Sequence, residues 1–205
     1  IAGAVGSIGS ELARQLYNYE PACLLLMDKD ENGIYELRLQ LDPRTPKQRF
    51  ELLVGDIRSV KKVQTIFKQF RPEIVFHAAA HKHLSLMESN PAEAILNNVF
   101  GTKNLLEHAI TFESSIFVFI SSDKAVRPTS VMGASKRLGE LIVESKSKQS
   151  QTRLACVRFG NVMGSRGSVI PLIKRQIAKG GPITLTDPGA YRYFMTIPEA
   201  VQLVI

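Results

Sequence analysis

The sequence predicts an α/β fold in which helices cover both faces of a parallel sheet, and three observations support this. Short runs that are apolar throughout recur along the chain, as expected of strands that are buried on both faces. Segments with helical periodicity lie between them, and this alternation is typical of a parallel sheet. A glycine triplet also opens the first helical segment, where folds of this kind bind phosphate.

The predicted elements follow one another in regular order. The expected strands are the runs CLLLM, FELLV, EIVFHAAA, SIFVFI and LACVRF, which end near residues 28, 55, 80, 121 and 160. The expected helices cover residues 9–19, 31–41, 60–70, 91–111 and 133–149. We therefore predict a Rossmann-type doubly wound parallel sheet over residues 1–160 and part of a smaller substrate-binding subdomain over residues 161–205.

Both ends of the sequence look cut. Only Ile1 and Ala2 precede the glycine loop, so the strand that should lead into it is truncated, and a helical pattern still runs at the last residue. We expect the chain to be part of a longer protein. Membrane attachment is expected only through segments that this sequence does not contain, because it has no apolar run of about 20 residues.

Composition excludes some classes of function. The net charge of +7 is spread over helix-type positions without interleaved aromatic residues, so we do not expect nucleic-acid binding. Cys23 and Cys156 lie in apolar runs and are predicted to be buried, unpaired thiols. We expect a cytoplasmic protein, or one at the cytoplasmic face of the inner membrane in its full-length form.

The stretch GAVGSIGSEL has the spacing of a dinucleotide-binding loop. Gly3 permits a tight turn, Gly6 lets the backbone approach a pyrophosphate, and Gly9 lets the helix pack close to the sheet. Ser7 and Ile8 would present free N–H groups at the helix start. Such a triplet alone is weak evidence, because tight turns also produce it.

Three strand ends add to that evidence. Asp28 is placed to accept hydrogen bonds from the adenosine ribose, although an acidic residue there would serve equally well as a helix cap. Asp56, with Ile57, is placed to border the adenine. Small residues after the next strand would let a dinucleotide lie close: Ala78, Ala79 and Ala80. We expect NAD, because the Asp28 carboxylate repels a 2′-phosphate; the adjacent Lys29 leaves NADP open.

The polar stretch SSDKAVRPTSVMGASKRLGE follows an apolar strand directly. By itself, its Asp123–Lys124 pair is most simply a surface pair that closes a turn. Its second lysine, Lys136, stands four residues after Met132, so both side chains would lie on the same helix face.

Five motifs carry a resemblance that covers nearly the whole chain. They are GSIGSEL, FHAAAHKHLSLMESNPAEAILNNVFGTKNL, SSDKAVRPTSVMGASKR, RFGNVMGSRGSVIPLIKRQI and RYFMTIPEAVQLV. The chain resembles the extended short-chain dehydrogenase/reductase superfamily. Within it, the chain is similar to the bacterial UDP-N-acetylglucosamine 4,6-dehydratases of polysaccharide biosynthesis, in the long branch that has methionine where the superfamily has tyrosine.

The resemblance implies a reaction. Such enzymes oxidise the sugar at C4, eliminate water across C5 and C6, and return the hydride to C6. Lys124 would be the base that removes the C5 proton, and Asp123 the acid that protonates the departing C6 hydroxyl. Ser122 would orient the C4 oxygen.

Further roles follow from the same resemblance. Lys136 would bind the nicotinamide ribose. Met132 cannot exchange a proton, so Asp123 would accept the C4 proton instead, and Met132 is equally well explained as packing. Asn98 and Thr102 would fix the backbone near the nicotinamide. Contacts to substrate would come from Lys82, His83, Asn161, Arg166 and Ser168.

Alternatives remain open at this point. A zinc site at His81 and His83 lacks clear third and fourth ligands, so we expect no metal. A nucleotide-sugar 4-epimerase or dehydrogenase would use the same scaffold, but it would not need the Asp123–Lys124 pair. A non-catalytic NAD(P)-binding sensor would explain the missing tyrosine. We expect an enzyme that binds a UDP-sugar and forms a homo-oligomer.

Overall fold

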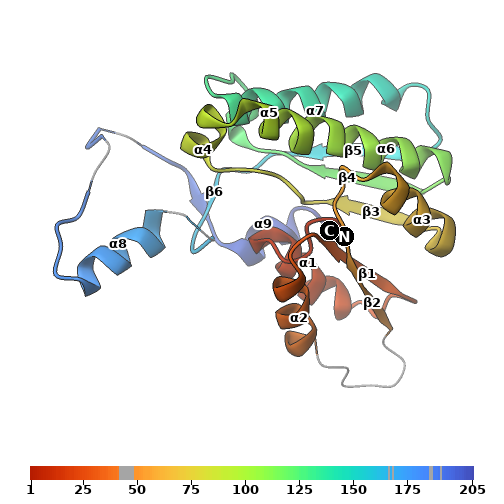
Figure 1. Ribbon diagram of the computed structural model, residues 1–205, viewed down its shortest axis with the longest axis horizontal. Helices are drawn as coiled ribbons and strands as arrows, with labels where there is room; N and C mark the ends of the chain where they lie inside the picture. Colours follow the sequence, from red (N-terminus) through yellow and green to blue (C-terminus); the bar gives the residue numbers. More distant parts are fainter. Residues whose placement is uncertain (42–48, 166, 168, 185–186, 190) are drawn as a thin grey trace.

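The computed structural model describes residues 1–41, 49–165, 167, 169–184, 187–189 and 191–205 (Figure 1). Five strands run parallel: β1 (Leu24–Asp28), β2 (Phe50–Val54), β3 (Ile74–His77), β4 (Ile116–Ile120) and β5 (Arg153–Val157). Ala2 bridges β1 and β3 through Met27 and His77. The order is therefore β2-β1-Ala2-β3-β4-β5, in which Ala2 lies between the two halves of the sheet.

Helices cover both faces of the sheet (Figure 1). One face packs against α3 (Val60–Phe70), α6 (Gly101–Thr111) and α7 (Val131–Ser147), and the other against α1 (Ser7–Tyr17), α2 (Glu31–Gln40) and α9 (Ile197–Gln202). Alternation along β4 explains the two cores. Phe117 and Phe119 enter the core with α3, α6 and α7, whereas Val118 and Ile120 enter the core with α1 and α9. The doubly wound α/β prediction is confirmed.

Short polar side chains begin several of these helices. Asp30 accepts a hydrogen bond from the Gly33 N–H at the start of α2, and Ser130 accepts one from the Gly133 N–H at the start of α7. Thr196 and Glu199 form a reciprocal capping box at α9. These caps fix where each helix begins relative to the strand end before it.

Smaller elements complete the described chain. They are α4 (Leu84–Ser89), α5 (Pro91–Ala94), a π-helix η1 (Ile95–Phe100), a 3₁₀ turn η2 (Asp123–Ala125), β6 (Asn161–Val162), α8 (Val169–Ala178) and β7 (Phe194–Met195). The two short strands β6 and β7 pair in parallel. In Figure 1, α8 lies apart from the sheet and its covering helices. Among the described residues, no helix is both long and apolar enough to span a bilayer.

The structure differs from the sequence predictions in several respects. The single helix expected over residues 91–111 is continuous but contains the π-helix, and α4 and α8 were not predicted. The burial predicted for the two cysteines is wrong: Cys156 is exposed and Cys23 is half-buried. Cys156 lies on β5, which pairs on one side only within the described sheet. The domain boundary at residue 160 remains a prediction, and α9 contributes Val201 to the core beneath β4.

An apolar cavity of about 620 Å³ lies at the amino end of the sheet, between β1 and β3 beside Ile1. Its lining is mainly aliphatic and aromatic, with Leu24 and Val75 on the flanking strands. The polar side chains with candidate chemistry lie at the opposite, carboxyl end of the strands, where ligands bind in open α/β sheets.

Candidate active site

The glycine loop has the close contacts that its spacing predicts. Gly3 has a φ of +82°, and a Cβ there would run into the Ala79 backbone. A Cβ at Gly9 would collide with the Gly3 carbonyl, so this position requires glycine for helix packing. Gly6, by contrast, would meet only the Gly3 carbonyl, at 3.4 Å. The bare backbone at Gly6 therefore leaves room for an approaching ligand.

Helix α1 begins at Ser7, and no side chain caps it. The backbone N–H groups of the first helical turn, to which Ser7 and Ile8 belong, point out of the start of the helix. Together with the helix dipole they form a site suited to a diphosphate.

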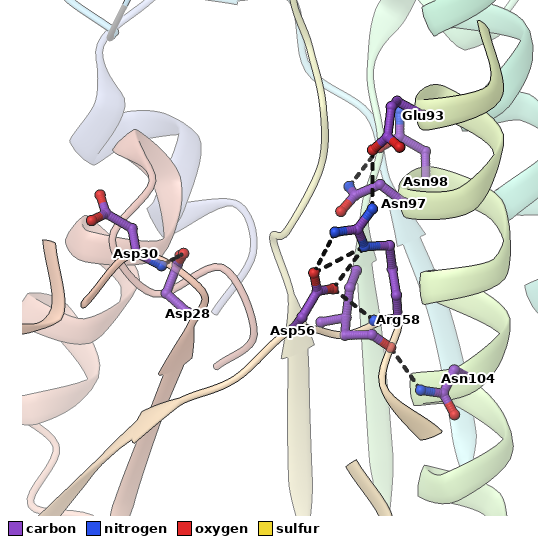
Figure 2. A network of polar contacts seen from close by, with 9 residues as sticks. Asp28, Asp30, Asp56, Arg58, Glu93, Asn97, Asn98 and Asn104 are labelled. Atoms are coloured by element: carbon purple, nitrogen blue, oxygen red, sulfur yellow. Dashed lines mark hydrogen bonds and ion pairs between the residues drawn. The ribbon is translucent and has the colours of Figure 1, made fainter. Parts of the chain in front are cut away.

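The adenosine end of the predicted site is a small cavity of about 90 Å³. Asp28 is held there by two backbone donors. Its carboxylate accepts from the Val5 N–H at 3.2 Å and from the Asp30 N–H at 3.1 Å (Figure 2). Asp30 caps α2, so Asp28 is not that helix's cap. The cavity brings together seven predicted residues: Gly3, Asp28, Lys29, Asp56, Ile57, Ala79 and Ala80. Ala78 packs instead against the core beneath β3.

Asp56 is part of an ion cluster that the sequence analysis did not predict. Arg58 donates from Nε and Nη2 to Asp56 at 2.7 to 3.1 Å, and its Nη1 reaches Glu93 at 3.0 Å (Figure 2). Burial alone would raise the pKa of Asp56, but the hydrogen bonds and charge of Arg58 outweigh it and lower the pKa. The cluster ties the loop after β2 to α5. Its only sequence signal is an arginine two residues after Asp56.

Two consecutive asparagines on the π-helix are buried beside this cluster. Asn98 accepts a hydrogen bond from the His81 N–H at 2.8 Å and donates to the His81 carbonyl and to Ser135 Oγ, both at 2.9 Å. Asn97 donates to Asn98 and also lines the adenosine cavity (Figure 2). The wider π turn lets both neighbours face inward. Asn98 thus holds the loop after β3 and α7 together, while Thr102 donates to its backbone carbonyl.

The polar stretch after β4 forms a compact group that we call the Lys124 cluster: Ser122, Asp123, Lys124 and Asn161. Lys124 Nζ donates to Asp123 Oδ1 at 2.9 Å and to Asn161 Oδ1 at 3.0 Å. Ser122 Oγ also donates to Asp123 Oδ1, at 2.9 Å. Burial would raise the pKa of Asp123, but these neighbouring donors prevail and lower it. Asp123 is therefore ionised at rest and able to accept a proton.

Lys136 lies deeper than the Lys124 cluster. Its Nζ donates to the Ile120 carbonyl at 2.7 Å and sits 4.5 Å from the centre of the Phe119 ring. Burial lowers the pKa of Lys136 to about 8. Met132, one turn earlier, is 3% exposed and packs against Met87 and Ala94. The structure thus places Met132 in a packing role, one of the two explanations its sequence allowed.

A second group, the Glu140 cluster, lies behind the site and was not predicted. Glu140 accepts from Ser121 Oγ at 2.6 Å, from Arg158 Nε at 2.7 Å and Nη2 at 2.6 Å, and from Arg137 at 2.9 Å. Its side chain is only 4% exposed. Burial would raise the pKa of Glu140, but the hydrogen bonds from Arg158 and the other donors lower it to about 2. The cluster ties α7 to the ends of β4 and β5.

The residues predicted to contact substrate come from two segments of the chain. Lys82 and His83 lie in the loop after β3, and the His83 ring lies against Gly167, where a Cβ would collide with it. Asn161 joins Lys124. Arg166 and Ser168 lie outside the described residues. Within the described ranges, no group of three or more potential ligands is placed to hold a metal ion.

Comparison with known proteins identifies the family. Residues 1–205 match the family described as "Polysaccharide biosynthesis protein". The chain belongs to this family. It is 50% identical to the probable polysaccharide biosynthesis protein EpsC of Bacillus subtilis, covering all of this chain and 34% of that protein. It is also 36% identical to a UDP-glucose 4-epimerase of Rickettsia canadensis, again over the whole chain and 60% of that protein.

Solved structures show the same fold. Pen from Bacillus thuringiensis matches with a TM-score of 0.90 and 37% identity, over 99% of this chain and 62% of that one. DesIV of Streptomyces venezuelae, a dTDP-glucose 4,6-dehydratase solved with NAD and TYD, matches with a TM-score of 0.83 over 98% of this chain and 68% of that one. Its identity of 23% supports the fold alone. The resemblance to the extended short-chain dehydrogenase/reductase superfamily is thus confirmed, for a chain that spans about a third to two thirds of these proteins.

Proposed function

We propose that this chain is the dinucleotide-binding and catalytic part of a nucleotide-sugar 4,6-dehydratase that acts on UDP-N-acetylglucosamine and yields a UDP-4-keto-6-deoxy sugar. One observation carries the proposal. An ionised carboxylate and an amine, Asp123 and Lys124, are held 2.9 Å apart at the carboxyl end of β4. Water elimination next to a ketone needs both a base and an acid at one place, and this pair supplies them.

The proposed cofactor is NAD, which would accept a hydride from C4 and return it to C6. The residues present fit it. The bare backbone at Gly6 and the start of α1 suit the pyrophosphate, and Asp28 is fixed by Val5 and Asp30 beside the adenosine cavity. A carboxylate at this position suits ribose hydroxyls better than a 2′-phosphate. DesIV, with NAD bound on the same fold, supports this choice.

The proton transfers can be assigned to side chains of this chain. Asp123, ionised at rest, takes the proton from the C4 hydroxyl as the C4–H hydride leaves, which produces the 4-ketone. Lys124, after releasing one ammonium proton to solvent, then removes the proton at C5, which the ketone has made acidic. The C5–C6 double bond forms as the C6–O bond breaks, and Asp123 gives its proton to the leaving hydroxyl, so that water departs. The bound nicotinamide would supply the hydride for C6, and Lys124 would return its proton to C5, which would complete the turnover.

This scheme needs no tyrosine. Met132 packs against Met87 and Ala94 and has no proton to exchange, so proton exchange at C4 must use another group, and Asp123 has the ionisation state for it. Lys136 Nζ, now on the Ile120 carbonyl, lies on the same helix and would bind the nicotinamide ribose. We infer that one carboxylate serves both as base at C4 and as acid at C6.

A second candidate has its own support. The chain is 36% identical to a UDP-glucose 4-epimerase, so epimerisation at C4 is the rival reaction. It requires neither a C5 base nor a C6 acid, and the Lys124 cluster would then have no chemical use. The homo-oligomer and the cytoplasmic location remain predictions.

The test uses the full-length protein with UDP-N-acetylglucosamine and NAD, with product analysis by mass spectrometry. We expect a product lighter by one water, and a loss of about 100-fold to 10,000-fold in its rate in Lys124→Ala. Lys146→Ala, an exposed lysine near the end of α7, is the matched control and should keep the parent rate.

Two outcomes would count against the proposal. An isobaric product with inverted C4 would establish the epimerase. Bound NAD without sugar turnover would establish a sensor.

A further inference from the structure

We propose that Asn161 is a positioning residue for the base Lys124, rather than a ligand of the sugar nucleotide. The inference rests on the proposed function and extends it. The sequence predicted Asn161 as a substrate contact, but in the structure its side-chain oxygen accepts a hydrogen bond from Lys124 Nζ at 3.0 Å. The lysine ammonium can only donate, so the amide oxygen must face it.

The backbone around Asn161 holds its side chain in place. The Asn161 N–H donates to the Tyr193 carbonyl at 3.1 Å, and Asn161 pairs in register with Phe194 across β6 and β7. The Asp123 N–H donates at 3.1 Å to the carbonyl of Phe159, which lies two residues before Asn161. This bond anchors the turn η2, which contains Lys124. Lys124 and Asn161, 37 residues apart, are thus brought together by main-chain contacts that do not involve either side chain.

The hydrogen bond to Asn161 helps to fix the orientation of the Lys124 amine. An ammonium group has three N–H donors, and Asp123 and Asn161 accept two of them. When two N–H bonds of Lys124 are held in this way, the direction of the third N–H bond is fixed as well. The nitrogen lone pair has this same direction when the third proton is absent. Without Asn161, Lys124 would be held at one point only and could rotate about the Asp123 contact. The C5 proton transfer depends on that direction, because small misplacements in a site are costly.

The chemical nature of Asn161 also suits a base. A neutral amide oxygen orients the amine without adding negative charge beside it. Asp123 already places one carboxylate 2.9 Å from Lys124 Nζ. Asparagine therefore supplies the second acceptor without a second negative charge.

The experiment compares Asn161→Leu and Asn161→Asp with the parent, as full-length protein supplied with UDP-N-acetylglucosamine and NAD. Leucine is similar in size and removes the acceptor. For Asn161→Leu we expect kcat for water loss to fall about tenfold to 100-fold, with KM changed by less than about threefold. C4 oxidation should persist, so reduced nicotinamide should accumulate and be visible by its absorbance. Asn161→Asp keeps an oxygen acceptor for Lys124 Nζ, so its kcat should lie closer to that of the parent than the kcat of Asn161→Leu does.

Each other result has a defined meaning. A KM raised about tenfold with kcat retained would overturn the proposal and make Asn161 a direct substrate ligand. A lower kcat without accumulation of reduced nicotinamide would also overturn it, because C4 oxidation itself would be impaired. If the parent shows no water loss, the proposed function fails first. Thermal unfolding of each variant shows whether β6 and β7 have kept their pairing.

Discussion

Two carboxylate clusters meet at the carboxyl end of β4, and they are built from consecutive serines. Ser121 donates a hydrogen bond to Glu140, whose side chain is 4% exposed. Ser122 donates one to Asp123, whose side chain is 44% exposed. Both carboxylates also accept hydrogen bonds from a cation, and both have a lowered pKa. They differ in burial and in the number of donors. The buried Glu140 is fully engaged and its charge is fixed, whereas the open Asp123 retains access to a ligand. We expect the same chemistry to serve stability at Glu140 and proton transfer at Asp123.

The largest effect on stability is expected at the buried Glu140 cluster. Glu140→Gln removes the charge that two arginines surround, and we expect a loss of about 3 kcal/mol in unfolding free energy at pH 7, because the Arg158 and Arg137 charges then face a neutral amide. Chemical denaturation of parent and variant measures it. An effect below about 1 kcal/mol would show that the cluster behaves like a surface ion pair.

The same variant has a pH signature with a defined sign. The pKa of Glu140 is about 2 in the folded chain and about 4.3 in the unfolded chain, so its contribution is present above pH 4.3 and is lost as the pH falls toward 2. The difference between parent and Glu140→Gln should shrink across this window.

A smaller effect of opposite sign is expected at Lys136. Burial lowers the pKa of this lysine to about 8, so the folded state carries a charge there at a cost. Lys136→Met should therefore raise the unfolding free energy at pH 7 by roughly 1–2 kcal/mol, while it removes cofactor-dependent turnover.

The sign of this change in unfolding free energy can be checked by measuring stability as a function of pH. Between about pH 8 and the unfolded value of about 10.4, the unfolded chain holds a proton that the folded chain has released, so the parent's stability rises with pH. Lys136→Met should lack that rise. A destabilised variant at pH 7 would mean that the contacts to Ile120 and Phe119 outweigh the burial of charge.

The smallest effects separate the two serines directly. Ser121→Ala should cost about 1–2 kcal/mol in unfolding free energy, because a buried hydrogen bond to a charged group is lost. Ser122→Ala should change stability by less than about 0.5 kcal/mol, because that contact is half-exposed, and should lower the rate of water loss instead. Thermal melts and product assays on the pair measure both. Equal stability losses would contradict the division between the clusters.

The features that depend on local sequence pattern, namely the strands and the glycine loop, could be predicted from the sequence. Apolar runs marked the five strands, and the spacing of Gly3, Gly6 and Gly9 placed a turn and a helix start whose steric contacts the structure shows. Because the strands are parallel, their carboxyl ends had to share one edge, so Asp28 and Asp56 were expected at one cavity, where they lie.

Contacts between side chains distant in sequence could not be predicted this way. Glu140 reads as an ordinary helix position, and only the pairing of β4 with β5 brings Arg158 to it. Asn161 meets Lys124 because the chain after β5 passes beside η2, where the Asp123 N–H donates to the Phe159 carbonyl, and this path has no periodic signal in the sequence. The π-helix was not predicted for a similar reason, because its hydrophobic spacing differs by a single residue from that of an ordinary helix.

That single extra residue limits which sequence changes this region can tolerate. Removing one residue between Ile95 and Phe100 would restore an α-helix but rotate everything before it by about 100° relative to α6. Asn97 and Asn98 could not then both face inward, and the His81 backbone would lose its amide clamp. Length is therefore under stronger constraint than composition here: relatives that differ at most of these six positions should still align without a gap.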